Sequence, residues 1–254
     1  MPYNVSVLVT LSAYPYLGMC LIMLLLCAVA VLTARRNARL LLLSGVLCIP
    51  YGLFSFEYIP QYWDPRVTFH YISSPEDLLF SFCAGILATR MLLFFQPGTY
   101  SVTREKGLVW KRYLLYSVIG IAIGYGVRFG VTGTPVMVST LSGVAVTGLI
   151  LAFKRSRFVA GSVLGALGFS LLYALLVRSS FAIWPHFENA WRNAEVHTGW
   201  LLGVPLFEIY WALGYGLVWP LLAVHCLLDE EAARRIAGVL PHELPRGSQS
   251  LHGG

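Results

Sequence analysis

Two acidic residues that could exchange a proton stand at matching places in the two halves of the chain. Asp77 follows Pro75 at the start of one long apolar run, and Glu208 follows Pro205 at the start of another. A carboxyl group facing an apolar cavity holds its proton more tightly and can act as a general acid, and an ionised one can act as a base. Acidic residues at the mouth of a membrane-spanning segment are costly, which favours a functional role for both.

The sequence around the two acids also matches. When Asp77 is aligned with Glu208, Phe80 falls on Trp211 and Gly85 on Gly216. Ordinary helix capping is an alternative, because a proline and an acid suit the exposed N–H groups of a first helical turn. Capping does not account for an aromatic residue one turn later in both halves. The catalytic and the capping interpretations both stay open.

Two further acids are candidates for the same chemistry. Glu76 precedes Asp77 directly, so we treat them as a pair, and Glu57 closes an apolar run that ends in aromatic residues. For Glu57, a second acid in a cavity and a plain interfacial charge are equally good interpretations. Three other acids are expected in solvated loops, namely Asp64, Glu188 and Glu195.

Aromatic residues gather near these acids. Belts of tryptophan and tyrosine at membrane interfaces are the ordinary reason for such enrichment, and a cavity lining that stabilises a carbocation with its ring faces is the alternative. The candidates for the lining are Phe80, Tyr210, Trp211, Tyr58, Tyr62, Trp63 and Trp184. The best of them by position are Phe80, Tyr210 and Trp211.

Composition places the chain in a membrane. Of its 254 residues, 57% are hydrophobic and only 12% are charged, and several apolar runs reach spanning length. The net charge of +6 is distributed as membrane topology, not as a nucleic-acid-binding surface. The five cysteines have no CxxC spacing, and His70 and His197 have no metal-ligand spacing, so neither a disulfide framework nor a metal is expected. The first charge is Arg35, so no cleavable signal peptide is expected.

Seven membrane helices are predicted. Their ranges are 11–34, 40–56, 76–96, 112–131, 135–153, 158–177 and 200–227. Basic residues gather in alternate connections and in the tail, which by the positive-inside rule places the N-terminus outside and the C-terminus in the cytoplasm. These residues are Arg35, Arg36, Arg39, Arg104, Lys106, Lys111, Arg112, Lys154, Arg155, Arg157, Arg234 and Arg235. The predicted localisation is the cell membrane.

The predicted fold class is an all-α polytopic membrane protein built from two parallel three-helix repeats and a linking helix. The first repeat covers 1–100, the linking helix 101–133 and the second repeat 134–229. The tail 230–254 is polar and rich in proline and glycine, and is expected to be disordered. Sites in repeat-built membrane proteins tend to form where the repeats meet.

These motifs resemble the lycopene cyclase domain family, membrane cyclases that occur as heterodimers or as fused two-repeat chains. The resemblance is carried by 58–63, an aromatic and proline-containing outer connection, and by 75–80 and 205–211, each of which opens a helix with proline, acid and aromatic residues. It covers roughly 5–97 and 135–228.

The resemblance implies a proton-initiated, redox-neutral ring closure at the end of a linear isoprenoid. One acid would protonate the terminal double bond, and a base would remove a proton after ring closure. Glu208 and the pair Glu76–Asp77 would supply acid and base in unassigned order, with Glu57 in reserve. The mechanism implies no cofactor. The implied partners are a lipophilic isoprenoid or carotenoid, the lipid bilayer, and a second copy of the chain or other carotenoid-pathway enzymes.

Three alternatives remain. Another membrane terpene or meroterpenoid cyclase would be marked by a polar cavity end for a head group or epoxide. A proton-coupled transporter could bind a proton or cation at the two acids, although transport sites usually lie at the midplane. An idle partner subunit would have no activity alone. A retinal pigment is excluded because the only lysines, Lys106, Lys111 and Lys154, lie in basic connections.

Overall fold

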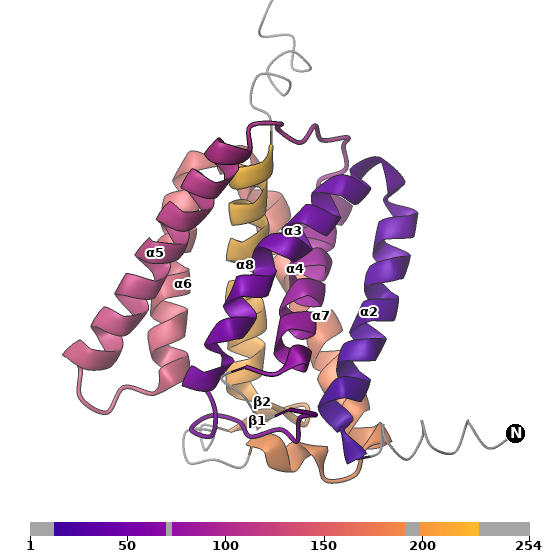
Figure 1. Ribbon diagram of the computed structural model, residues 1–254, viewed down its shortest axis with the longest axis vertical. Helices are drawn as coiled ribbons and strands as arrows, with labels where there is room; N and C mark the ends of the chain where they lie inside the picture. Colours follow the sequence, from indigo (N-terminus) through magenta and orange to yellow (C-terminus); the bar gives the residue numbers. More distant parts are fainter. Residues whose placement is uncertain (1–12, 70–72, 192–198, 229–254) are drawn as a thin grey trace, which may run out of the picture.

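The computed structural model describes residues 13–69, 73–191 and 199–228, and most of them are helical. The long helices pack side by side as one bundle (Figure 1). They are α2 (Pro15–Thr33), α3 (Ala38–Gly52), α4 (Pro75–Phe95), α5 (Lys106–Gly130), α6 (Val136–Lys154), α7 (Val159–Ile183) and α8 (Leu206–Leu227). The first two residues of the predicted helix 11–34 and the predicted disordered tail 230–254 lie outside the described residues.

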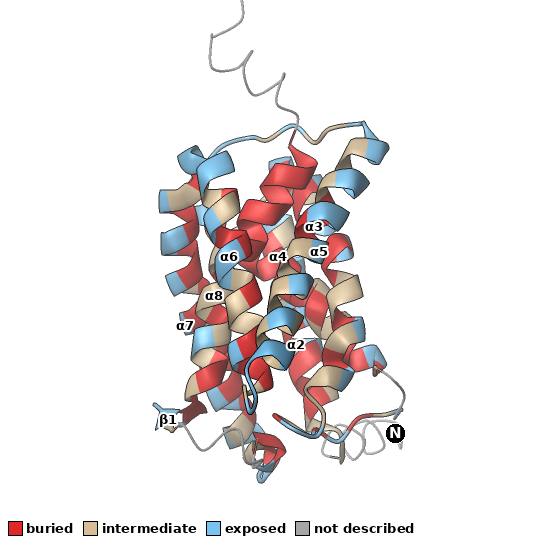
Figure 2. Ribbon diagram, turned by 90° about the vertical axis from the view of Figure 1, so that its left-hand side faces the viewer, coloured by how far each residue is buried: buried red, intermediate tan, exposed pale blue. Residues whose placement is uncertain are grey.

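The bundle has the surface of a membrane protein. Seven helical segments of the described chain are long and apolar enough to cross a membrane. Buried residues face the inside of the bundle, and exposed residues lie on its outer faces (Figure 2). Many of these outer side chains are large and apolar, for example Leu25 at 69%, Phe129 at 78% and Phe153 at 86% exposure. Such a surface is stable against lipid and not against water.

Helix α4 lies at the centre of the bundle, in contact with α2, α3, α7 and α8. At Gly85, a Cβ atom would come within 2.8 Å of the Cys48 Cβ on α3. At Gly216, a Cβ atom would come within 3.0 Å of the Ala166 Cα on α7. Both glycines therefore allow a close approach of two helices, α4 to α3 and α8 to α7.

The predicted bounds of the last helix are wrong at its start. Residues 200–205 form a two-stranded antiparallel hairpin, with β1 (Trp200–Leu201) and β2 (Val204–Pro205), before α8 begins. Leu202 and Gly203 make the turn with φ of 55° and 75°, a left-handed backbone that cannot continue a right-handed helix. The glycine and the following proline were the available signals. Helix α7 also runs to Ile183, beyond the predicted end at 177.

Short 3₁₀ helices complete the connections. At one end of the bundle, η1 (Arg35–Asn37) links α2 to α3 and η3 (Ser156–Phe158) links α6 to α7. At the other end, η2 (Leu53–Glu57) follows α3 and η4 (Phe187–Trp191) follows α7. The predicted acids and aromatics of the outer connections belong to this second end, together with the first turns of α4 and α8.

Candidate functional site

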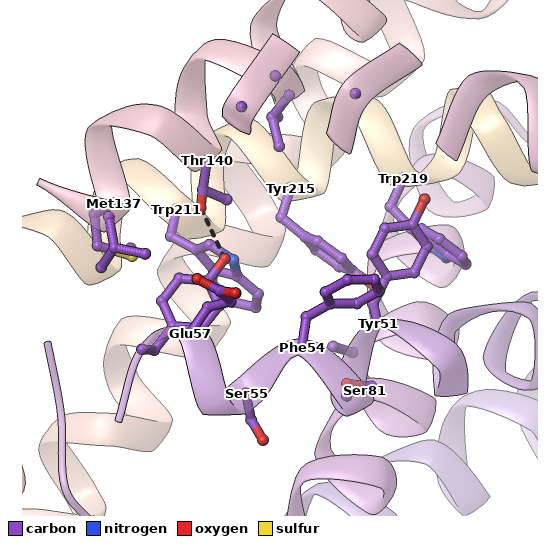
Figure 3. A pocket seen from close by; sticks show the side chains of 18 of the residues that line it. Tyr51, Phe54, Ser55, Glu57, Ser81, Met137, Thr140, Trp211, Tyr215 and Trp219 are labelled. Carbon is purple, nitrogen blue, oxygen red and sulfur yellow. Dashed lines mark hydrogen bonds between the residues drawn. The ribbon is translucent and has the colours of Figure 1, made fainter. Parts of the chain in front are cut away.

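A cavity of about 300 Å³ opens among α3, η2, α4, α5, α6 and α8. Most of its lining is aromatic or aliphatic, and three carboxyl side chains also line it, those of Glu57, Asp77 and Glu208. Figure 3 shows Glu57, Thr140 and Met137 toward one end, with Tyr51 and Trp219 toward the other. Its volume is at the lower limit for small-ligand sites, enough for one end of a long chain.

Glu208 is held by three donors from three different segments. Its Oε1 accepts hydrogen bonds from the Tyr62 hydroxyl at 2.6 Å and from the Trp191 indole N–H at 2.9 Å. Its Oε2 accepts one from the Tyr173 hydroxyl at 2.5 Å. The side chain is only 6% exposed. A buried carboxyl group with such a set of donors is fixed in one orientation toward the cavity.

The three donors to Glu208 lie on three different segments of the chain. Tyr62 lies in the connection after η2, Tyr173 in the middle of α7, and Trp191 at the end of η4. Burial raises the pKa of Tyr62, and the neighbouring charge of Glu208 raises it further. Tyr62 therefore keeps its proton and remains a donor to Glu208 at physiological pH.

Asp77 is held largely by its own helix end. Its Oδ2 accepts hydrogen bonds from the Ser74 backbone N–H at 2.8 Å and from the Ser74 hydroxyl at 2.9 Å. The Asp77 N–H donates back to the Ser74 Oγ, which completes a capping box at the start of α4. Among the described residues, the distant donor is the Tyr16 hydroxyl of α2, 3.0 Å from Oδ1. The capping interpretation is thus confirmed for Asp77.

No such cap exists at the second acid. Helix α8 begins after Pro205, whose side chain offers no hydrogen bond to the helix end. Since the Glu208 side chain bonds to other segments, its position is set by tertiary structure and not by local capping. The two acids therefore align in sequence but are held in place differently, Asp77 by its helix cap and Glu208 by tertiary hydrogen bonds.

Phe80 lies between the two acid sites. Its ring centroid is 6.2 Å from that of Tyr16, the distant partner of Asp77, and 6.1 Å from that of Tyr173, a partner of Glu208. It also lies 5.7 Å from Trp211, the residue with which it aligns in the repeat. A continuous aromatic wall therefore joins the surroundings of the two carboxyl groups.

A second aromatic row follows α8 along the cavity. Trp211, Tyr215 and Trp219 are spaced four residues apart, which places them on one face of the helix. Their rings are stacked, with centroids 4.9 Å apart for the first pair and 5.8 Å for the second. Tyr51 of α3 packs edge-on against Trp219 at 5.6 Å. This row gives an extended apolar ligand a surface of ring faces.

Glu57 lies at a polar end of the cavity. Its Oε1 accepts a hydrogen bond from the Tyr125 hydroxyl of α5 at 2.7 Å. Beside it, the Tyr58 hydroxyl and the Thr140 Oγ1 of α6 share a hydrogen bond of 2.8 Å. Arg128, one turn after Tyr125, also lines the cavity. This end of the cavity therefore places a carboxyl group, a guanidinium group and two hydroxyl groups close together.

Three predicted site residues lie outside the cavity, in contrast to Glu57, Asp77, Glu208, Tyr58, Tyr62, Trp63, Phe80 and Trp211, which line it. Glu76 is buried but points away, with Oε1 accepting the Thr68 N–H at 2.9 Å. Tyr210 is 47% exposed, because two residues past Glu208 the helix has turned about 200°. Trp184 caps α7 and packs against Gly18 of α2. Tyr210 and Trp184 are therefore not among the residues that line this cavity.

Several lining residues were missed from the sequence. Tyr16 and Tyr173 are single polar groups inside apolar runs, a signal that a buried hydrogen-bond partner is present. The four-residue spacing of Trp211, Tyr215 and Trp219 was also readable as one helix face. No sequence signal pairs Trp191 with Glu208, because their contact depends on how η4 folds back over the bundle.

The described part of the chain contains no group of three or more His, Cys, Asp or Glu side chains placed to hold a metal ion. Comparison of the sequence and structure with protein-family models, curated proteins and solved structures found no match. The cavity and its lining are therefore the basis for a proposed function.

Proposed function

We propose that the protein is an integral-membrane cyclase that closes a ring at the end of a linear isoprenoid, of which a lycopene-type carotenoid is the first substrate to test. The observation that carries this proposal is that two buried carboxyl groups, Asp77 and Glu208, line one largely aromatic cavity in a bundle of membrane-spanning length. A hydrocarbon substrate dissolved in the bilayer would be bound in this cavity.

The chemistry needs one proton donor, one proton acceptor and no oxidant. The acid adds a proton to the terminal double bond and leaves a tertiary cation. The π electrons of the next double bond form the new carbon–carbon bond and close the ring. Loss of a proton to the base restores a double bond, so the product is an isomer of the substrate. Water must be kept out, because it would capture the cation.

Glu208 and Asp77 are the proposed acid and base, with Glu57 in reserve. An indole N–H can only donate, so Oε1 of Glu208 must accept the Trp191 hydrogen bond in every protonation state. A proton on Glu208 therefore belongs on Oε2, shared with the Tyr173 hydroxyl. Asp77 would use Oδ1, which faces Tyr16, because Oδ2 is occupied by the helix cap.

The aromatic wall suits a cationic intermediate. Faces of Phe, Tyr and Trp rings attract positive charge, more strongly when the site is desolvated. Phe80 and Trp211 lie side by side in the cavity lining, next to the tyrosines that hold the two acids. The tertiary cation formed on protonation would be stabilised there by the ring faces.

The proposal includes the two-repeat architecture and its orientation. Support comes from the close approach of α4 to α3 at Gly85 and of α8 to α7 at Gly216, which are aligned positions in the two halves. Further support is that 3₁₀ helices flank the second helix of each half, η1 and η2 around α3 and η3 and η4 around α7. The basic connections at the opposite end from the acids would face the cytoplasm.

Pigment analysis tests the proposal. The full chain is expressed in a bacterial host that accumulates lycopene, beside a Glu208→Gln variant and the matched control Glu188→Gln, whose side chain does not line the cavity. We expect monocyclic or bicyclic carotenes from wild type and control, and at least about a hundredfold less from Glu208→Gln. Unchanged lycopene with wild-type protein folded in the membrane would contradict the carotenoid substrate.

A second candidate is a cyclase for another terpenoid, one that carries a polar group. The observation that favours it is the polar end of the cavity around Glu57, which a carotene hydrocarbon would leave unused. The same carboxyl groups would perform the same proton chemistry.

A further inference from the structure

The polar end of the cavity contains a donor that the protein leaves unused. Arg128 donates from Nη2 to the Gln61 side chain, while its Nη1 is buried and has no hydrogen-bond partner among the described residues. A buried donor without a partner is costly, and the cost is greater for a charged group. Arg128 nevertheless lines the cavity, near the end of a helix long enough to span a membrane.

An acceptor lies at the same end. Glu57 receives one hydrogen bond in the described part of the chain, from Tyr125 to its Oε1. A carboxylate has about four acceptor positions, so Glu57 retains capacity toward the cavity. Arg128 and Tyr125 are three residues apart on α5 and therefore share a helix face.

The charges of Glu57 and Arg128 both act on the Tyr58 hydroxyl group. Burial raises the pKa of Tyr58, the charge of Glu57 raises it and the charge of Arg128 lowers it. The charge of Glu208 also acts on it, in the same direction as that of Glu57. The unused donor, the unused acceptor and Glu208 all line the same cavity as Tyr58, and the charge of each acts on its hydroxyl group.

We propose that this end of the cavity binds the hydroxyl group of an isoprenoid alcohol, which accepts a hydrogen bond from Arg128 and donates one to Glu57. A hydrocarbon would leave the arginine unpaired, an ether or ketone could only accept, and an anion would face the Glu57 carboxylate. A neutral hydroxyl group is the one that complements both side chains. The proposal rests on the proposed function only for the isoprenoid nature of the ligand.

The hydroxyl contact would also set the direction of the chain. Trp211, Tyr215 and Trp219 extend away from the polar end along α8, toward Tyr51, whose hydroxyl group already donates a hydrogen bond to the Ser117 hydroxyl. An alcohol bound between Glu57 and Arg128 would lay its chain along this row. The hydroxyl contact would then fix how far along the cavity the terminal double bond of a chain of given length can reach.

Competition binding tests this inference on the purified full chain in detergent. Tritiated farnesol is displaced by unlabelled farnesol, by farnesyl methyl ether, and by the matched hydrocarbon in which a methyl group replaces CH₂OH. We expect the alcohol to bind about tenfold more tightly than the hydrocarbon, with the ether between them, since hydrogen bonds to charged groups are the stronger kind. Arg128→Met should reduce the alcohol's advantage to about twofold, and Glu57→Gln should weaken the alcohol more than the ether.

The control variant is Arg66→Met, because Arg66 is exposed and does not line the cavity. It should keep the wild-type preference. Equal binding of alcohol and hydrocarbon to the wild type, or an unchanged preference in Arg128→Met, would overturn the inference while leaving lycopene cyclisation untouched. Conversely, a preference for the alcohol together with unchanged lycopene in the pigment assay would overturn the carotenoid substrate and support the hydroxyl site.

Discussion

Asp77 and Glu208 align in sequence, are both buried and line the same cavity, yet they are held in different ways. Two of the three hydrogen bonds to the Asp77 carboxyl group come from Ser74, three residues earlier at the cap of its own helix. All three donors to Glu208 come from other segments, namely Tyr62, Tyr173 and Trp191. One acid is part of a local helix start, and the other is part of a tertiary arrangement.

This difference separates two explanations that the sequence leaves equal. A capping carboxyl group has a complete structural reason to be where it is, because it satisfies exposed N–H groups of the first turn. Glu208 has no such reason, since a buried carboxyl group costs free energy that a glutamine or an apolar residue would avoid. Three hydrogen-bond donors from other segments stabilise the buried Glu208 carboxyl group, as expected for a residue with a functional role.

The largest expected effect of this contrast is on activity. Glu208→Gln should lower ring formation about a thousandfold, and Asp77→Asn should lower it about a hundredfold. Asparagine still offers an oxygen to the Ser74 N–H and keeps the start of α4 in place, whereas glutamine keeps the position of Glu208 but cannot carry the proton. Product per folded protein, measured by pigment chromatography and membrane immunoblot, gives both values. Equal losses would mean that the two acids are equivalent, as their alignment implies.

A smaller effect is expected on stability, from changing the helix cap that holds Asp77. Ser74→Ala removes the cap hydroxyl and should lower the free energy of unfolding by about 1 kcal/mol. Ring formation should stay within about twofold, because the Tyr16 contact at Oδ1 is kept. Ser142→Ala is a matched control, since in the described part of the chain the Ser142 hydroxyl bonds to the Val138 carbonyl of its own helix.

Thermal unfolding in detergent measures the change. If Ser74→Ala were as stable as the wild type but inactive, the capping interpretation of Asp77 would fail and a direct role for this end of the site would follow.

Features that depend on neighbouring residues could be predicted from the sequence, and contacts between distant segments could not. The membrane helices were predictable because each depends only on a run of apolar residues, and Asp77 and Glu208 were found because a charge at the start of such a run is rare. The hairpin at 200–205 was missed because its apolar residues resemble a helix start, and only Gly203 and Pro205 argue otherwise. The Trp191 contact with Glu208 could not be predicted, since it joins the end of η4 to α8 through folding of the outer connection. Tyr210 was misplaced because its face of α8 depends on which neighbours the helix has.

The smallest expected effect concerns alkaline pH and belongs to the Glu208 side of the comparison. Burial and the charge of Glu208 raise the pKa of Tyr62 above its ordinary value of 10.0. A group whose pKa is raised in the folded state contributes stability that is present below its unfolded pKa and is lost as pH rises above it. The melting temperature should therefore fall between pH 9 and about pH 11, and Tyr62→Phe should fall less than the wild type. The exposed Tyr210→Phe should follow the wild type. If the melting temperatures of Tyr62→Phe and wild type fell by the same amount, Tyr62 would not be a proton-bearing partner of Glu208. The donors from other segments that distinguish Glu208 from Asp77 would then be two, Tyr173 and Trp191, in place of three.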